Sequence, residues 1–221
     1  MDTRTWWRRW VVLVTAGEVL GFLVPALVVA VTRGLPDVAV LGCLVVAGSV
    51  EGAVLGWSQA VALRPRLPRL RRGRWVALTS SAAALAWLAG MLPSTTYAWW
   101  SGWPAAAVVA LAVPHGLVLL CSIGVAQTVE LRRHVRTGAR WVGVTAGAWA
   151  VALTVFMAVA TPLWQPGQST AVVLLGGSLA GLAMAVSMAA LTGAGMARLL
   201  RGQTSEVARS TEPSLGGSTK R

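Results

Sequence analysis

Three titratable side chains stand inside long apolar segments of this sequence: Glu18, Glu51 and His115. At ~1.5 Å per helical residue, Glu18 and Glu51 lie roughly 12 and 18 Å from one end of their segments, and His115 about 15 Å from the opposite end. A carboxylate in the middle of a bilayer costs at least ~2.5 kcal/mol, so each carboxyl must carry a proton, meet a partner or face water. One hypothesis is a proton or ligand site. The alternative is a neutral packing group that hydrogen-bonds a carbonyl, Ser49 or Ser122.

Two glutamines, Gln59 and Gln127, each lie about one helical turn before a basic loop. A glutamine at this depth can donate and accept hydrogen bonds between helices, a contact worth ~0.6–2 kcal/mol. One interpretation is a clamp between helices. The other is a pair of pseudo-symmetric ligand contacts at a vestibule on the cytoplasmic side, which would make both glutamines candidate site residues.

Catalytic motifs are missing from the sequence: it has no H-E-x-x-H, G-x-S-x-G, P-loop or C-x-x-C pattern. With two histidines and two cysteines, Cys43 and Cys121, it offers no set of residues with metal-ligand spacing. We therefore expect neither an enzyme nor a bound metal or cofactor.

Long apolar segments must position these residues. The 221-residue chain is 56% hydrophobic and 12% charged, about half the charged fraction of ordinary soluble domains. Runs of roughly 20 apolar residues can cross a bilayer core of ~30 Å as helices. The sequence predicts an all-α membrane protein with six spans, at 10–31, 38–63, 75–92, 105–129, 141–163 and 170–197.

The basic residues predict the orientation of these spans. All but one of the 19 lysines and arginines, Arg33, fall on one side, and the positive-inside rule places that side in the cytoplasm. Both termini are then cytoplasmic, with a terminal segment at 1–9, a transmembrane domain at 10–201 and a polar, disordered tail at 202–221. Arginine-rich composition, with one lysine, suggests a bacterial cytoplasmic (inner) membrane. Tryptophans at the basic ends of the spans are expected to anchor at headgroup level: Trp6, Trp7, Trp10, Trp75 and Trp141.

An internal repeat becomes visible when Gln59 is aligned with Gln127. The alignment also pairs Gly48 with Gly116, Gly56 with Gly124, Leu63 with Leu131, Arg64 with Arg132 and, after a two-residue gap, Arg74-Trp75 with Arg140-Trp141. Spans 2–3 and 4–5 are therefore predicted to be parallel tandem copies of one helical hairpin.

Glycines in this repeat recur at helical spacing. Small residues let helices approach closely in lipid, where burying apolar groups gains little. We expect helix packing through Gly48, Gly52, Gly56, Gly116 and Gly124.

The repeated pattern G-x3-G-x2-Q-x3-L-R, followed by R-W at the next span, resembles that of small bacterial polytopic membrane proteins built from such hairpins. The resemblance covers about residues 42–163 and implies the fold without an activity. Leu120 stands where the pattern has glycine.

The arginine loop RPRLPRLRRGR at 64–74 is the densest charge cluster. Anionic lipid headgroups attract such residues by ~1 kcal/mol each, which makes Arg66, Arg69, Arg71 and Arg72 candidate headgroup contacts. The equally good interpretation is that the loop only fixes topology. The net charge of +12 belongs to these loops, so the expected partners are membrane lipids and another membrane protein or a second copy, and not nucleic acid.

Three roles follow from these features. The sequence favours a structural or accessory membrane protein that packs through small-residue faces. A small transporter or proton-coupled permease using Glu18, Glu51 and His115 is the first alternative. A regulator that binds anionic lipid through the arginine loop is the second.

Overall fold

The computed structural model describes residues 2–163 and 167–211, and these form helices without any strand. The long helices are α1 (Thr3–Val31), α2 (Asp37–Leu63), α3 (Arg72–Thr95), α5 (Ala105–Leu131), α6 (Trp141–Leu163) and α7 (Thr170–Thr211), and two short ones, α4 (Tyr97–Trp100) and η1 (Gly138–Arg140), lie between them. Six helices in this part of the chain are long and apolar enough to cross a membrane. The prediction of an all-α fold with six such helices is confirmed.

Both terminal helices extend further than the sequence indicates. α1 begins at Thr3 because the Asp2 carboxylate accepts the backbone N–H of Thr5 at 2.6 Å. This capping bond also lowers the pKa of Asp2. α7 continues to Thr211, so residues 202–211 are helical rather than a disordered tail. The first proline after this span, which would disfavour helix before it, is Pro213; residues 212–221 lie outside the described part of the chain.

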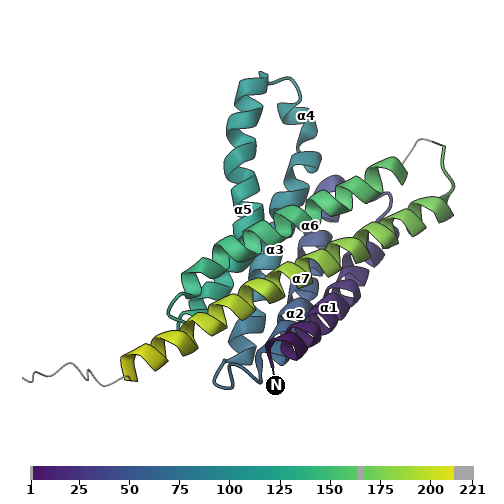
Figure 1. Cartoon of the computed structure of the whole chain (residues 1–221). Helices are drawn as coiled ribbons and strands as arrows, with labels where there is room; N and C mark the ends of the chain where they lie inside the picture. The colour runs from purple at the N-terminus through teal and green to yellow at the C-terminus, as the bar shows by residue number, and fades with distance from the viewer. Residues whose placement is uncertain (1, 164–166, 212–221) are drawn as a thin grey trace, which may run out of the picture.

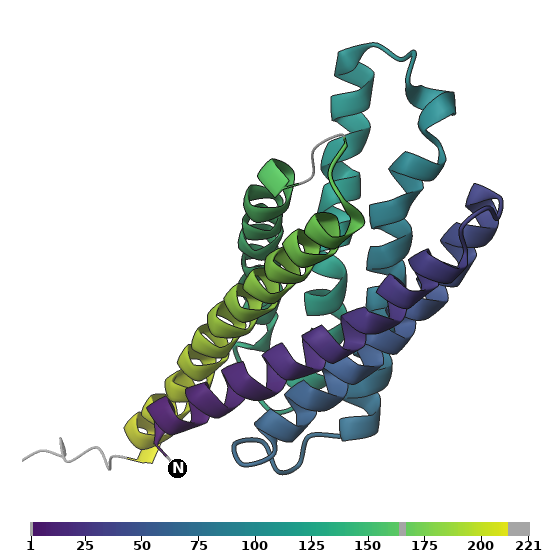
Figure 2. The same ribbon diagram turned by 90° about the vertical axis from the view of Figure 1, so that its right-hand side faces the viewer.

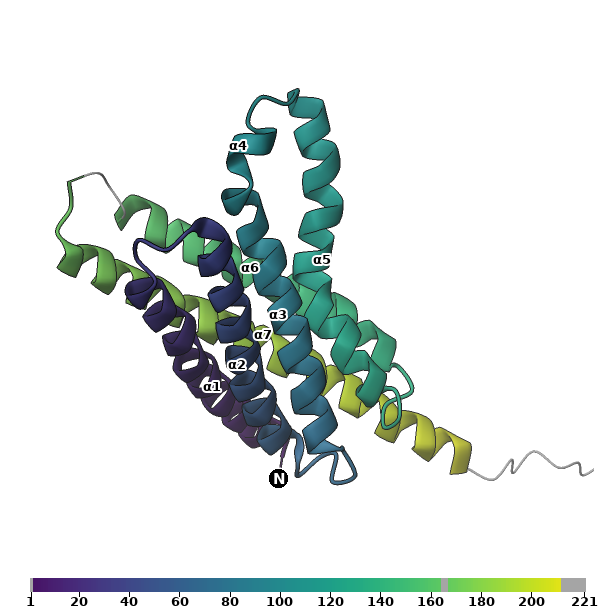
Figure 3. The same cartoon turned by 180° about the vertical axis from the view of Figure 1, so that it is seen from behind.

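The long helices form a closed ring in chain order. Each packs against its neighbours in the sequence, and α7 closes the ring by packing on α1. As Figure 1 and the opposite view in Figure 3 show, the helix pairs α1–α2, α3–α5 and α6–α7 converge at one end of the molecule and diverge at the other. The converging end carries the arginine loops 64–71 and 132–137, and we call it the basic end. Figure 2 shows the same divergence after a quarter turn.

Buried tryptophans fill the ring near the basic end. Trp6, Trp10, Trp75 and Trp141 are at most 1% exposed. Trp6 donates its indole N–H to the Ala62 carbonyl at 2.9 Å, and the Trp10 and Trp141 rings meet edge to face. These four indoles therefore face the interior of the bundle rather than its outer surface, and their N–H groups bond partners on neighbouring helices.

Glycines of α2 and α5 permit the closest helix contacts. A Cβ on Gly52 would lie 2.9 Å from the Thr79 carbonyl oxygen, and one on Gly56 would lie 2.9 Å from the Thr79 Cβ. Gly124 likewise faces α6, with Val142 Cα 2.9 Å from the Cβ position. Gly116 does not share this arrangement, since no atom lies within 4 Å of its Cβ position.

Candidate functional site

A cavity of about 570 Å³ occupies the centre of the ring, and all the long helices contribute to its wall. On α1, α2, α3, α5 and α6 the lining residues include pairs three or four positions apart, which places them on the inward face of each helix. The wall is apolar apart from two carboxyl groups. The acidic and aromatic residues of the wall are Glu18, Phe22, Glu51, Trp87, Trp149 and Phe156.

Glu18 is the most isolated polar group of this cavity. The residue is 1% exposed, and neither carboxyl oxygen has a hydrogen-bond partner among the described residues. Glycines beside it let α1 approach α2: a Cβ on Gly21 would lie 3.1 Å from the Glu51 Cγ, and one on Gly17 would lie 2.6 Å from the Ser58 Cβ. The sequence of α1 thus brings Glu18 and Glu51 to the same cavity wall.

Glu51 is held in place by a tryptophan. The Trp87 indole N–H donates to Glu51 Oε2 at 2.6 Å, from α3 to α2. The Trp87 ring reaches this position because it lies across Gly48, where a Cβ would stand 2.8 Å from the indole nitrogen. Phe22 packs on the other side, with ring centroids 6.4 Å apart. Gly48 therefore positions Trp87, and Trp87 positions Glu51.

His115 does not join the two carboxyl groups. It bonds the Ala89 carbonyl of α3 through Nε2 and lies outside the cavity wall. Ser49 and Ser122, the other partners considered from the sequence, donate to carbonyls of their own helices, Val46 and Leu119. The structure therefore brings together Glu18 and Glu51 and leaves His115 apart.

Gln59 and Gln127 lie between the cavity and the basic end, and neither lines the cavity. Gln127 Nε2 donates to Gln59 Oε1 at 2.7 Å and to Thr79 Oγ1 at 2.8 Å. Each glutamine oxygen also accepts an indole N–H, from Trp75 at 3.2 Å and from Trp141 at 2.7 Å. Gln127 on α5 thus binds α2, α3 and α6. We call Gln59, Gln127 and the two tryptophans that bond them, Trp75 and Trp141, the glutamine layer.

The two glutamine–tryptophan pairs make corresponding contacts. In both, the glutamine near the end of one helix accepts the indole N–H of the tryptophan near the start of the next. Thr79 and Thr145, one turn further, each donate to the carbonyl of that tryptophan, at 2.8 and 2.9 Å. The alignment of the two sequence repeats also pairs Gln59 with Gln127 and Trp75 with Trp141.

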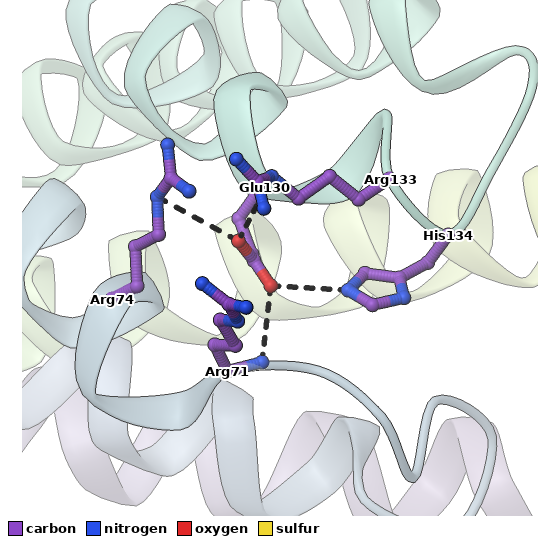
Figure 4. A network of polar contacts seen from close by, with 5 residues as sticks. All are labelled: Arg71, Arg74, Glu130, Arg133 and His134. Atoms are coloured by element: carbon purple, nitrogen blue, oxygen red, sulfur yellow. Dashed lines mark hydrogen bonds and ion pairs between the residues drawn. The ribbon is translucent and has the colours of Figure 1, made fainter.

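Glu130 forms a cluster that the sequence analysis missed. It lies in the last turn of α5 with its side chain fully buried, and Oε1 accepts the Arg71 backbone N–H and faces His134 Nε2, each at 3.0 Å. The Arg74 and Arg133 Nε atoms lie 3.7 and 3.8 Å from Oε2. Figure 4 shows the carboxylate between these groups. Glu130 is the one acidic residue in the stretches 64–74 and 130–140, which is the signal that would have identified it.

The arginine-loop residues occupy varied positions at the basic end. The Arg66 guanidinium lies 5.9 Å from the centre of the Trp6 ring, a cation–π contact. Arg69, Arg71 and Arg72 have exposed side chains. The Arg71 backbone connects this loop to Glu130.

Comparisons with protein-family models, curated proteins and solved structures find no match for this chain. The six long apolar helices of the described residues are compatible with a multi-pass integral membrane protein.

Proposed function

We propose that this chain is a small proton-coupled permease of a cell membrane, and that the central cavity is its solute and proton site. The observation that carries the proposal is the Glu18 carboxyl, buried without a partner in the cavity wall beside Glu51. Isolated burial of a carboxylate costs several kcal/mol, so Glu18 carries a proton when the cavity holds no cation. A group of this kind can exchange its proton for a solute.

The position of the glutamine layer between the cavity and the basic end supports a transport function. Gln59 follows Glu51 by eight positions, or about 12 Å of helix, so the glutamine and tryptophan layer separates the cavity from the basic end. The helix pairs α1–α2, α3–α5 and α6–α7 diverge toward the end opposite the basic end (Figures 1 and 3). We infer a conformation that is closed toward the basic end, and alternating access then requires the glutamine layer to open.

Orientation and the hairpin repeat belong to the same proposal. The positive-inside rule places the basic end, with both termini, in the cytoplasm of a bacterial cell. The corresponding glutamine–tryptophan contacts support two parallel copies, α2–α3 and α5–α6, which is an arrangement that transporters use. A purely structural or accessory role explains the packed glycines but gives no reason for an unpartnered carboxyl at a cavity.

The test uses proteoliposomes that contain a pH-sensitive dye. Neutral, anionic and cationic solutes are added outside in turn, and the internal pH is recorded for the native chain, Glu18→Gln and Glu51→Gln. We expect at least one charge class to change the internal pH of native vesicles and not of Glu18→Gln vesicles. Asp37→Asn is the matched control, because this exposed carboxylate lies at the start of α2, away from the cavity.

The proposal would be contradicted if no solute class changed the internal pH of native vesicles more than that of empty ones. It would equally fail if Glu18→Gln and Glu51→Gln retained the native response, since the carboxyl groups would then have no part in coupling.

A further inference from the structure

We infer that the solute of the central cavity is an organic cation with an apolar, preferably aromatic, body, and that its binding displaces the proton of Glu18. This inference rests on the proposed function, because it names the solute class of the same site.

The sign of the ligand charge follows from the charges in the wall. Glu18 and Glu51 both face the cavity, and none of the described residues that line it is basic. In a low-dielectric site a carboxyl group that gives up its proton is stabilised by a cation and destabilised by an anion. A neutral solute would leave Glu18 without a partner, whereas a cation supplies the missing one.

The size and lining of the cavity indicate an organic body. Its volume of about 570 Å³ falls within the ~300–1,000 Å³ of small-molecule sites. Phe22, Trp87, Trp149 and Phe156 supply aromatic rings from α1, α3 and α6. Aromatic faces attract organic cations, and quaternary ammonium groups are bound in proteins by such rings.

Calcium and magnesium ions fit this wall poorly. Calcium takes about six to eight oxygen ligands and magnesium needs near-octahedral oxygen coordination. The cavity offers two carboxyl groups among apolar side chains, and the described residues contain no cluster of three or more histidine, cysteine or acidic side chains. A large cation with weak hydration matches both features.

The two carboxyl groups have different parts in this exchange. Glu51 is oriented by the Trp87 N–H at 2.6 Å, so it keeps a fixed place in the wall. Glu18 has no such bond and is the group that changes partner. When the cation enters, the Glu18 O–H bond breaks, the proton leaves to water and the carboxylate pairs with the cation, so that the total charge in the cavity is unchanged.

The experiment measures binding to the purified full chain in detergent by equilibrium dialysis. Tetraphenylphosphonium is the probe, and tetraphenylborate, which has nearly the same shape and the opposite charge, is the matched control. We expect saturable phosphonium binding that is at least about tenfold tighter than borate binding. Glu18→Gln should weaken it about tenfold or more, and Asp37→Asn should leave it unchanged.

The pH dependence in the native chain provides a second measurement, independent of whether Glu18→Gln folds. Because the phosphonium does not titrate, competition with a proton on the protein predicts weaker binding as the pH falls. Equal binding of both probes, no saturable phosphonium binding, or affinity independent of pH and of Glu18→Gln would each overturn the cation assignment. If anionic or neutral solutes still drive Glu18-dependent pH changes in vesicles, the permease proposal stands and the solute class alone is wrong.

Discussion

Replacing Gln127 by leucine tests the polar layer that joins the helices. Leucine is similar in size but cannot make the bonds to Gln59, Thr79 and Trp141, which lie at 2.7, 2.8 and 2.7 Å. We expect Gln127→Leu to lower the free energy of unfolding more than Gln59→Leu does.

The magnitude follows from the bonds that are lost. Interhelical side-chain bonds in membrane proteins contribute about 0.6 kcal/mol each on average, so three contribute about 2 kcal/mol. The substitution also leaves the Trp141 N–H unpaired in a fully buried position, which adds about 1–3 kcal/mol. Together these terms give an expected loss of about 3–5 kcal/mol. Gln59→Leu removes two bonds, those to Trp75 and Gln127, and should cost less.

The assay is reversible unfolding of the purified protein in mixed micelles with increasing sodium dodecyl sulfate, followed by tryptophan fluorescence. Thr154→Val is the matched control, because this exposed hydroxyl bonds only the Ala150 carbonyl of its own helix, and its effect should stay within about 0.5 kcal/mol. The double variant should lose less than the sum of the single variants, because Gln59 and Gln127 share one bond. If Gln127→Leu lowered the free energy of unfolding by as little as the control does, the glutamine bonds would not stabilise the bundle.

Three further substitutions test the packing and the two charged sites. Gly52→Ala places a Cβ 2.9 Å from the Thr79 carbonyl oxygen and should cost about 1–3 kcal/mol in the same unfolding assay, whereas Gly116→Ala, in open space, should cost nothing; equal effects would contradict the glycine contacts. Glu130→Gln removes the charge that faces Arg74, Arg133 and His134. It should lower the free energy of unfolding by about 1.5–3 kcal/mol. Native stability of this variant would show that the cluster does not stabilise the fold. Gly48→Ala should displace Trp87 and weaken phosphonium binding several-fold, while Gly42→Ala on the same helix, with no atom near its Cβ position, should bind like the native chain.

The number and approximate positions of the helices were predictable from the sequence, because long apolar segments alternate with short polar or basic loops. The six apolar segments became the six long helices of the described residues. Helix ends were less predictable, since a cap at Asp2 and the continuation of α7 to Thr211 depend on local bonds that hydropathy does not encode. The tryptophans at the basic end also differed from expectation, because their burial depends on which neighbouring helices offer acceptors.

For the candidate site, depth along a helix was predictable and lateral position was not. Glu18 and Glu51 lie at similar depth and meet because Gly17 and Gly21 let α1 approach α2. His115 faces the Ala89 carbonyl instead, since its direction depends on how α5 packs on α3. Glu130 was missed because a carboxylate among arginines in a loop suggests a solvated residue, whereas folding of both basic loops over the end of α5 buries it.

Proton release on cation binding tests the central claim most directly. Tetraphenylphosphonium is added to the purified native chain in weakly buffered detergent solution, and the pH change is converted to protons released for each cation bound. The account predicts about one proton per bound cation near neutral pH, and little or none for Glu18→Gln. Phosphonium that binds to the native chain without releasing protons, or that releases as many from Glu18→Gln, would contradict it.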